Sequence, residues 1–201
     1  IPGYETGTEL ALASSNERCV DCHMGTPTKQ VIAPHISKEG EPPLVRDVRS
    51  HLFAGARNSD ILSTTLNLLV DATPGKATVR IQNLTPHRVP TGFSGRSGVL
   101  EVVFFNGSKV IQTQRAEFRA IHLNQEGQET LSYTATRLKS DTRLKPYEIK
   151  TLTFVSPKEA TKVEAHLSYF LLSPSLHETL GIEDPVFTRP YPIAKAAAFF
   201  K

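Results

Sequence analysis

The sequence contains few cysteines, and this scarcity limits how they can be used. Cys19 and Cys22 are the only two, and they lie three positions apart. A disulfide between them would close a very small, strained loop and add little stability, so a disulfide-stapled fold is excluded. The pair must therefore serve a local chemical purpose.

Long apolar runs and a strong charge of either sign are also missing. No stretch of 18 apolar residues occurs, so we expect no membrane span. A formal net charge of +3 over 201 residues is too small to predict nucleic acid or an anionic membrane as a partner. The sequence opens on Ile1-Pro2-Gly3 without a basic, apolar leader, so we expect a processed soluble form whose signal peptide has been removed.

The first 62 residues show little regular periodicity. We expect a short helical stretch at 9–13, a loop over 25–43 that is rich in proline and glycine, and a second short helix at 45–56. Apolar residues that could form a core are scarce in this segment. A segment with so small a core usually needs an additional stabilising element, and a large buried cofactor would supply one.

From about residue 64 the pattern changes to the alternation that is typical of strands. Two alternating runs on either side of a turn at 73–76 predict a hairpin, although the run at 66–70 also suits a short helix. Further strands are expected at 99–105, 109–118, 130–136, 149–155 and 163–171. Six or seven short strands without helices between them predict an antiparallel sandwich of immunoglobulin or fibronectin type III style.

These patterns divide the chain into three parts. Residues 1–62 form an irregular, partly helical segment, residues 63–181 the β-sandwich, and residues 182–201 an extended C-terminal arm. Prolines stiffen the arm, and we expect it to pack back along the surface or onto the N-terminal segment. The predicted fold class is α+β, mainly β.

Cys19-Val20-Asp21-Cys22-His23 is the pattern by which haem c is attached to a polypeptide. The thiols add across two vinyl groups of the macrocycle, and their spacing places them on one turn so that His23 can direct its imidazole at the iron. A thioredoxin-like pair is disfavoured because no βαβ unit precedes Cys19, and a zinc site because no second cysteine pair exists. We expect one covalent haem c.

The second axial ligand is expected to be a histidine. Met24 is the only methionine, and it follows His23 too closely to reach the opposite face of the haem. His35 has only a short reach from the loop after the motif. Three others fall in or beside predicted strands, where a structural histidine is the ordinary interpretation: His122, His166 and His177.

Two stronger candidates remain, His51 and His87. His51 precedes Leu52 and Phe53, apolar side chains that suit a haem edge, and it lies far enough from the motif for the chain to pass around the macrocycle. His87 lies in a loop that two prolines stiffen. We rank His51 first and His87 a close second as metal ligands. The other histidine would line the pocket or serve a neighbouring subunit, and each could also be a structural histidine.

Three segments combine these residues: Cys19-x-x-Cys22-His23-Met24, Ser50-His51-x-Phe53-x-Gly55-Ala56, and Asn83-x-x-x-His87-x-x-Pro90-Thr91-Gly92 with Arg96 before an apolar strand. Together they resemble a pattern of bacterial multihaem c-type cytochromes over residues 17–106, which implies bis-histidine ligation. The chain departs from the pattern in two ways. It has one attachment motif where relatives have several, and Thr85-Pro86 replaces the glycine that usually precedes the second histidine.

Four arginines are candidates to bind the haem propionates, because a guanidinium pairs with a carboxylate in a bidentate geometry. They are Arg46, Arg49, Arg88 and Arg96, and each also suits an ordinary surface arginine. We expect Phe53 and Arg96 among the cofactor contacts. No serine–histidine–aspartate pattern, phosphate-binding glycine loop or pair of catalytic carboxylates is apparent.

The expected function is electron transfer at low potential to a redox partner protein, because an iron with two histidine ligands has no open position. A haem enzyme or small-ligand sensor is the alternative, with His51 or His87 as a distal acid or base. A third possibility is a binding protein in which the haem only staples the N-terminal segment. Since haem c is attached outside the cytoplasm, we expect a periplasmic or other extracytoplasmic location, as a subunit of a larger multihaem complex or a homo-oligomer.

Overall fold

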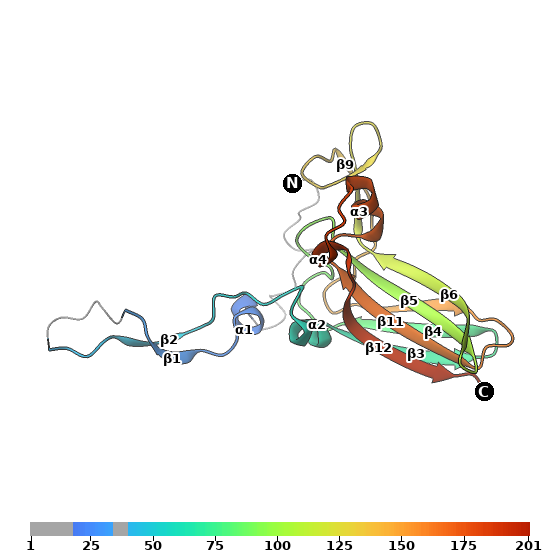
Figure 1. Ribbon diagram of the computed structural model, residues 1–201, viewed down its shortest axis with the longest axis horizontal. Coiled ribbons are helices and arrows are strands. Elements are labelled where there is room, and N and C mark those ends of the chain that lie inside the picture. The colour runs from blue at the N-terminus through green and yellow to red at the C-terminus, as the bar shows by residue number, and fades with distance from the viewer. Residues whose placement is uncertain (1–17, 34–39) are drawn as a thin grey trace.

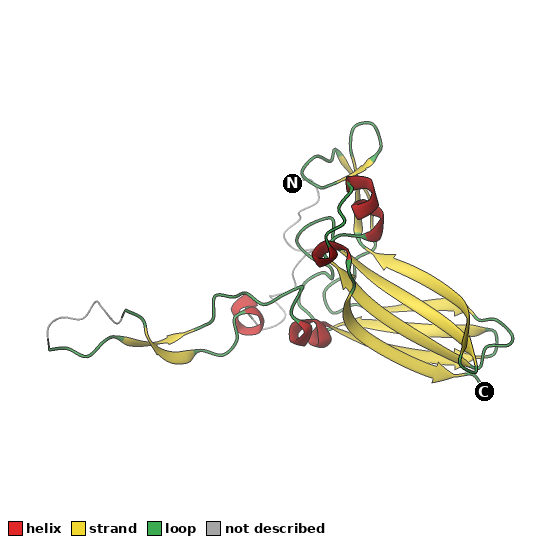
Figure 2. Ribbon diagram, in the orientation of Figure 1, coloured by secondary structure: helices red, strands yellow, loops and turns green. Residues whose placement is uncertain are grey.

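The computed structural model describes residues 18–33 and 40–201. An antiparallel β-sandwich forms the body, and a slender N-terminal extension, residues 18–33 and 40–56, projects from the end of the sandwich that carries helix α2 (Figure 1). Strands dominate, and the helices are few and short (Figure 2). The predicted α+β, mainly β fold class is confirmed.

Seven strands make up the two sheets of the sandwich. One sheet has the order β10-β4-β3 and the other the order β12-β11-β5-β6, and all neighbouring strands are antiparallel. The bounds are β3 Leu66–Thr73, β4 Lys76–Asn83, β5 Ser97–Asn106, β6 Lys109–Phe118, β10 Ile149–Val155, β11 Lys162–Phe170 and β12 Tyr191–Phe199. This arrangement is the predicted antiparallel sandwich.

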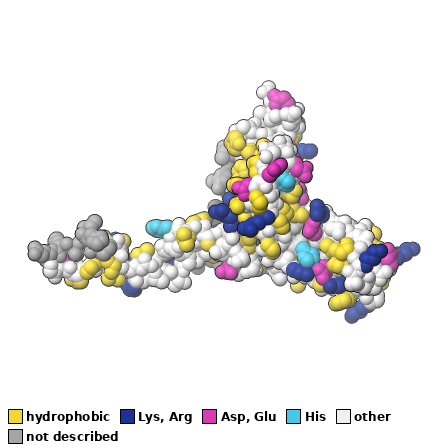
Figure 3. All heavy atoms as spheres, viewed as in Figure 1, with side chains coloured by type: hydrophobic (Ala, Val, Ile, Leu, Met, Phe, Trp, Pro, Cys, Tyr) yellow, Lys and Arg dark blue, Asp and Glu magenta, His cyan; other side chains and the backbone are white. Residues whose placement is uncertain are grey.

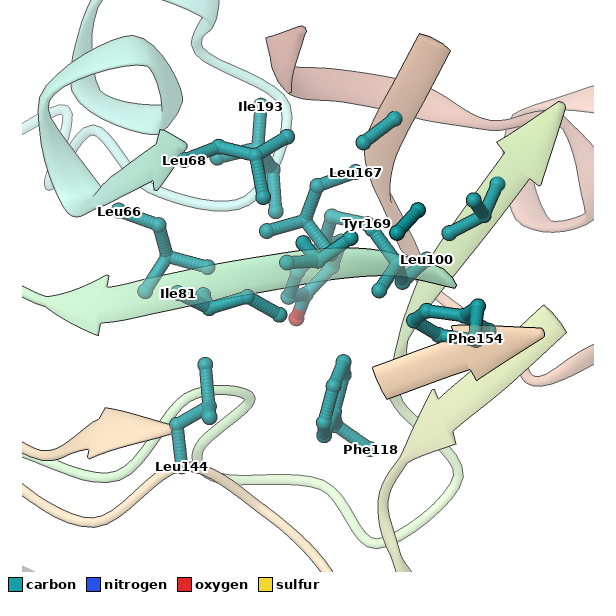
Figure 4. Close-up of a cluster of buried hydrophobic side chains, with 14 of the residues drawn as sticks. Leu66, Leu68, Ile81, Leu100, Phe118, Leu144, Phe154, Leu167, Tyr169 and Ile193 are labelled. Atoms are coloured by element: carbon teal, nitrogen blue, oxygen red, sulfur yellow. The ribbon is translucent and has the colours of Figure 1, made fainter. Parts of the chain in front are cut away.

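The core follows from the alternation of the strand sequences. On β4, Ala77, Val79 and Ile81 point inward and are fully buried. They meet inward-facing residues of the opposite sheet such as Leu100 and Leu167 (Figure 4). Burial of one such aliphatic side chain stabilises the fold by about 1.5–3 kcal/mol. The strand interpretation of 66–70 is therefore correct, because its alternating apolar residues face this core.

A third, smaller sheet lies between β6 and β10 in the chain. Its order is β8-β7-β9, with β7 Ala120–Leu123, β8 Glu129–Thr130 and β9 Arg137–Asp141. The strand predicted at 130–136 is wrong for most of its length. The chain turns there, and the Thr134 backbone N–H donates to the Leu131 carbonyl at 3.0 Å.

Three short helices flank the sandwich. Helix α2, Ser59–Thr65, begins after Asn58, whose side chain accepts a hydrogen bond from the Ile61 N–H at 2.9 Å. Helices α3, Pro174–Leu180, and α4, Pro185–Thr188, precede β12. The expected C-terminal arm thus contains α4 and β12, and β12 pairs with β11 as an edge strand. No helix within the described residues is long and apolar enough to cross a membrane.

The N-terminal extension contains helix α1, Cys19–His23, and the hairpin strands β1, Thr28–Val31, and β2, Val45–Val48. The predicted loop over 25–43 therefore includes a strand, and the helix predicted at 45–56 is wrong. The β-branched Val45 and Val48 favour a strand that pairs with β1. The helical stretch predicted at 9–13 lies outside the described residues. No residue of α1, β1 or β2 is buried, so these elements have no core of their own.

Candidate haem-binding site

Helix α1 brings the two thiols and the imidazole of the motif onto one turn. Cys19 and Cys22 are exposed free cysteines. The turn is closed at its start by Arg18, whose backbone N–H donates to the Asp21 carboxylate at 3.2 Å. Hydrogen bonds from Arg18 lower the pKa of Asp21. Because both cysteines are exposed, their thiols are accessible for thioether formation.

Arg49, which follows β2, braces this helix from the side. Its guanidinium donates to the Asp21 carboxylate at 2.7 Å and to the Val20 carbonyl at 3.2 Å, and it also bonds to the Gly25 carbonyl. The Arg49 side chain is thus engaged with the attachment turn. The sequence suggested a propionate partner or an ordinary surface arginine at this position and gave no sign of this bracing role.

The backbone around Ala54 fixes the orientation of the His23 imidazole. Nδ1 of His23 lies 2.5 Å from the Ala54 carbonyl oxygen, and the Ala54 N–H donates to the His23 carbonyl at 2.9 Å. Because Nδ1–H donates to a carbonyl in this contact, the Nε2 lone pair is left for a metal. The tautomer is the one that a haem ligand needs.

Phe53 packs directly on His23. The two rings stack with centroids 4.6 Å apart and planes inclined by 9°. Phe53 adopts a left-handed backbone conformation with φ of 43°, although it is not glycine. Such a conformation costs about 1–3 kcal/mol and is most often found at functional sites. The turn at Phe53 lets its ring cover His23 while Ala54 bonds to the imidazole.

His87 approaches the same imidazole from the sandwich. It lies in the loop 84–96, which joins β4 to β5, and its ring centroid is 6.3 Å from that of His23, with the planes inclined by 25°. Two imidazoles that bind one metal ion from opposite sides have ring centres about 6 Å apart, since each metal–nitrogen bond is about 2 Å long. The observed spacing fits one iron between the rings.

The His87 ring is also held by a backbone carbonyl. Nδ1 of His87 lies 2.9 Å from the Arg88 carbonyl oxygen, so Nδ1–H acts as the donor in this contact and the lone pair of the ring lies on Nε2. The loop itself is tied to the chain before β10. Val89 and Leu144 exchange backbone hydrogen bonds of 3.0 and 2.9 Å. His87 therefore projects from a well-anchored loop.

His51 lies on the surface of the extension. Its side chain is exposed, and within residues 18–33 and 40–201 it makes no hydrogen bond or ring contact. Leu52 beside it is 89% exposed. The structure thus brings His23, Phe53 and His87 together and leaves His51 facing solvent.

Arg96 lies at the wall of an apolar pocket between its loop and helices α3 and α4. Its guanidinium donates to the Thr91 carbonyl at 2.9 Å. Hydrophobic side chains, among them Leu180 and Phe187, gather on the surface over these helices (Figure 3). Arg88, another propionate candidate, lies 3.6 Å from the Asp141 carboxylate.

The remaining histidines have separate surroundings. His122 is buried on β7, where burial and the nearby Arg143 lower its pKa. His166 on β11 bonds to Glu164, and His177 lies on α3. His35 lies outside the described residues. No described residue of this group makes a ring contact with His23.

The residues present fit haem c. Two accessible thiols and an oriented imidazole occupy one turn, and a second oriented imidazole lies at the right distance for a shared iron. The extension that carries the motif buries nothing in α1, β1 or β2, and this is expected where a bound macrocycle supplies the missing apolar contacts.

Comparisons with known proteins give one informative likeness. No family model matches the sequence, and no curated protein matches it. A solved structure that the chain resembles is a penta-haem cytochrome c552 from Thermochromatium tepidum, with a TM-score of 0.71 and 25% identity. The likeness covers 92% of this chain and 48% of that chain, so the chain spans about half the length of the cytochrome. It supports a relationship to multihaem c-type cytochromes.

Proposed function

We propose that this chain is a c-type cytochrome that transfers electrons through one haem c whose iron is bound by His23 and His87. The observation that carries the proposal is the approach of the two imidazoles to 6.3 Å, from the extension on one side and the sandwich on the other. The haem supplies the iron that changes oxidation state.

The residues of the chain have distinct roles in this proposal. Cys19 and Cys22 tether the haem through thioethers, and the Ala54 and Arg88 carbonyls hold the two imidazoles in the tautomer that offers Nε2. Two histidine ligands would leave the iron no open position for a small substrate, and this favours electron transfer over catalysis. Two imidazole ligands also favour a lower reduction potential than histidine and methionine.

His87 now ranks above His51, which reverses the order suggested by the sequence. His51 is exposed and makes no hydrogen bond or ring contact with the motif in the described chain, whereas the His87 ring lies 6.3 Å from that of His23. Ligation by His87 ties the extension to the sandwich, so the haem has a structural role as well. His51 remains the competing ligand, or serves a neighbouring subunit.

The partner and the location follow from the same chemistry. We propose a redox protein as partner, an extracytoplasmic location where haem c is attached, and assembly into a larger multihaem complex. The five haems of the similar cytochrome, and its greater length, support the last point.

The test combines haem content with ligand access. A pyridine haemochrome assay on the purified holoprotein should give one haem per chain. The ferric form should be low-spin, and neither cyanide nor carbon monoxide should change the spectrum quickly. A high-spin spectrum with rapid ligand uptake would instead support a haem enzyme or sensor.

A further inference from the structure

A buried asparagine interrupts the apolar pattern of strand β4. The inward-facing positions of this strand are Ala77, Val79 and Ile81, followed by Asn83 at the end of the strand, and all four are fully buried. A leucine would continue the core at this point. A buried amide is destabilising unless its hydrogen bonds are satisfied, so its presence requires a reason beyond packing.

The hydrogen bonds of the Asn83 amide converge on the His87 loop. Its Nδ2 donates to the His87 carbonyl at 2.8 Å and to the Lys145 carbonyl at 2.8 Å. Its Oδ1 accepts from the Thr85 N–H at 3.0 Å and lies 2.8 Å from the Thr85 hydroxyl. One side chain thus joins the first half of the loop, the histidine itself and the chain before β10.

No other residue type of this size makes the same set of contacts. Aspartate keeps the acceptor toward Thr85 but cannot donate to His87 and Lys145, and leucine offers neither. The Thr85 hydroxyl adds a second link, since it also lies 3.0 Å from the His87 carbonyl oxygen. The amide therefore specifies the course of the loop as well as its stability.

We infer that Asn83 is a positioning residue that holds His87 where its imidazole can bind the iron, and this inference rests on the proposed ligation by His87. Without the amide, the loop gains conformations in which His87 is displaced. The iron would then be open to added ligands for part of the time.

The test compares Asn83→Ala with Ile81→Ala in the holoprotein. Both positions are fully buried on β4, but Ile81 lies within the core and makes no side-chain hydrogen bond to the loop. We expect Asn83→Ala to show a high-spin fraction and carbon monoxide binding that is faster by about tenfold or more, as an enlarged open population predicts. Ile81→Ala should lose stability and keep the wild-type spin state and binding rate. Added imidazole should restore the low-spin spectrum of Asn83→Ala.

Two further measurements complete the test. Amide hydrogen exchange over residues 84–90 should accelerate in Asn83→Ala more than in Ile81→Ala. If Asn83→Ala does not yield holoprotein, Thr85→Val should give the same changes more weakly, with Thr85→Ser as its control.

The outcomes separate the inference from the proposed function. If His87→Ala stays low-spin, the proposed ligation fails and the role of Asn83 falls with it. If His87→Ala becomes high-spin while Asn83→Ala, or Thr85→Val in its place, matches wild type, only the role of Asn83 is overturned. The role of Asn83 would also be overturned if Ile81→Ala showed equal changes in spin state and carbon monoxide binding, because general destabilisation would then explain both variants.

Discussion

The imidazole of His87 lies 6.3 Å from that of His23, centroid to centroid, although the two residues come from different parts of the molecule. His23 belongs to an extension whose helix and strands bury nothing, and His87 to a loop anchored on a well-packed sandwich. A shared iron would give the extension the tertiary contacts that its own residues do not provide. Under the proposed ligation, the haem would therefore also link the extension to the sandwich.

Covalent attachment should require at least one of the two cysteines. Cys19→Ala or Cys22→Ala should each leave one thioether and retain haem through denaturing electrophoresis, whereas the double variant should lose it. Haem staining of the gel measures this directly. Met24→Leu is the control and should stain like wild type. Persistent staining of the double variant would contradict attachment at this motif.

Phe53 should affect the reduction potential of the iron through its stacking on His23. Phe53→Ala uncovers one face of the imidazole, and greater access of water stabilises the more charged ferric form. We expect the reduction potential to fall by an amount on the order of tens of millivolts, with the spectrum remaining low-spin. Redox titration measures the shift. Phe93→Ala, at an exposed aromatic residue that does not stack on His23, should change the potential little, and an equal shift in both variants would count against this role.

An ion-pair cluster on the outer face of β11 should make stability depend on pH. Lys162, Lys195 and His166 lie within 2.5–3.1 Å of the Glu164 carboxylate. Hydrogen bonds, first from Lys162 and then from Lys195, lower the pKa of Glu164 from 4.5 to about 2. The contribution to stability is therefore complete above pH 4.5 and is lost as the pH falls toward about 2.

Urea unfolding of Glu164→Gln tests the direction of this pH dependence of stability. At about pH 6 the variant should be less stable than wild type, and near pH 3 the difference should have shrunk. Glu126→Gln, at an exposed glutamate without an ion pair in the described chain, should show no such trend. A difference that is constant with pH would exclude the cluster as the cause.

The sandwich could be predicted from the sequence because its signals are local. Alternation on β4 and β11, and the turn between β3 and β4, follow directly from side-chain period and turn chemistry. The sequence does not predict the hairpin of the extension, since its two strands are short and exposed and are not adjacent in the sequence. Val31 pairs with Val45, and sequence periodicity does not predict a contact between residues this far apart in the chain.

The site could be predicted only where its signal is local in the sequence. A fixed spacing identified Cys19, Cys22 and His23 as an attachment motif. The choice between His51 and His87 depends on how the β4–β5 loop folds over the extension, and that is a tertiary property. Asn83 left two usable signals: its place in the Asn83-x-x-x-His87 segment, and its polar side chain at an inward-facing position of an otherwise apolar strand.

The ferric absorption spectrum of two single variants tests the central claim most directly. His87→Ala should convert the iron to a high-spin form that binds carbon monoxide rapidly once reduced, and His51→Ala should remain low-spin and unreactive. The opposite result, a high-spin His51→Ala with an unchanged His87→Ala, would contradict ligation by His87. So would two variants that both keep the wild-type spectrum.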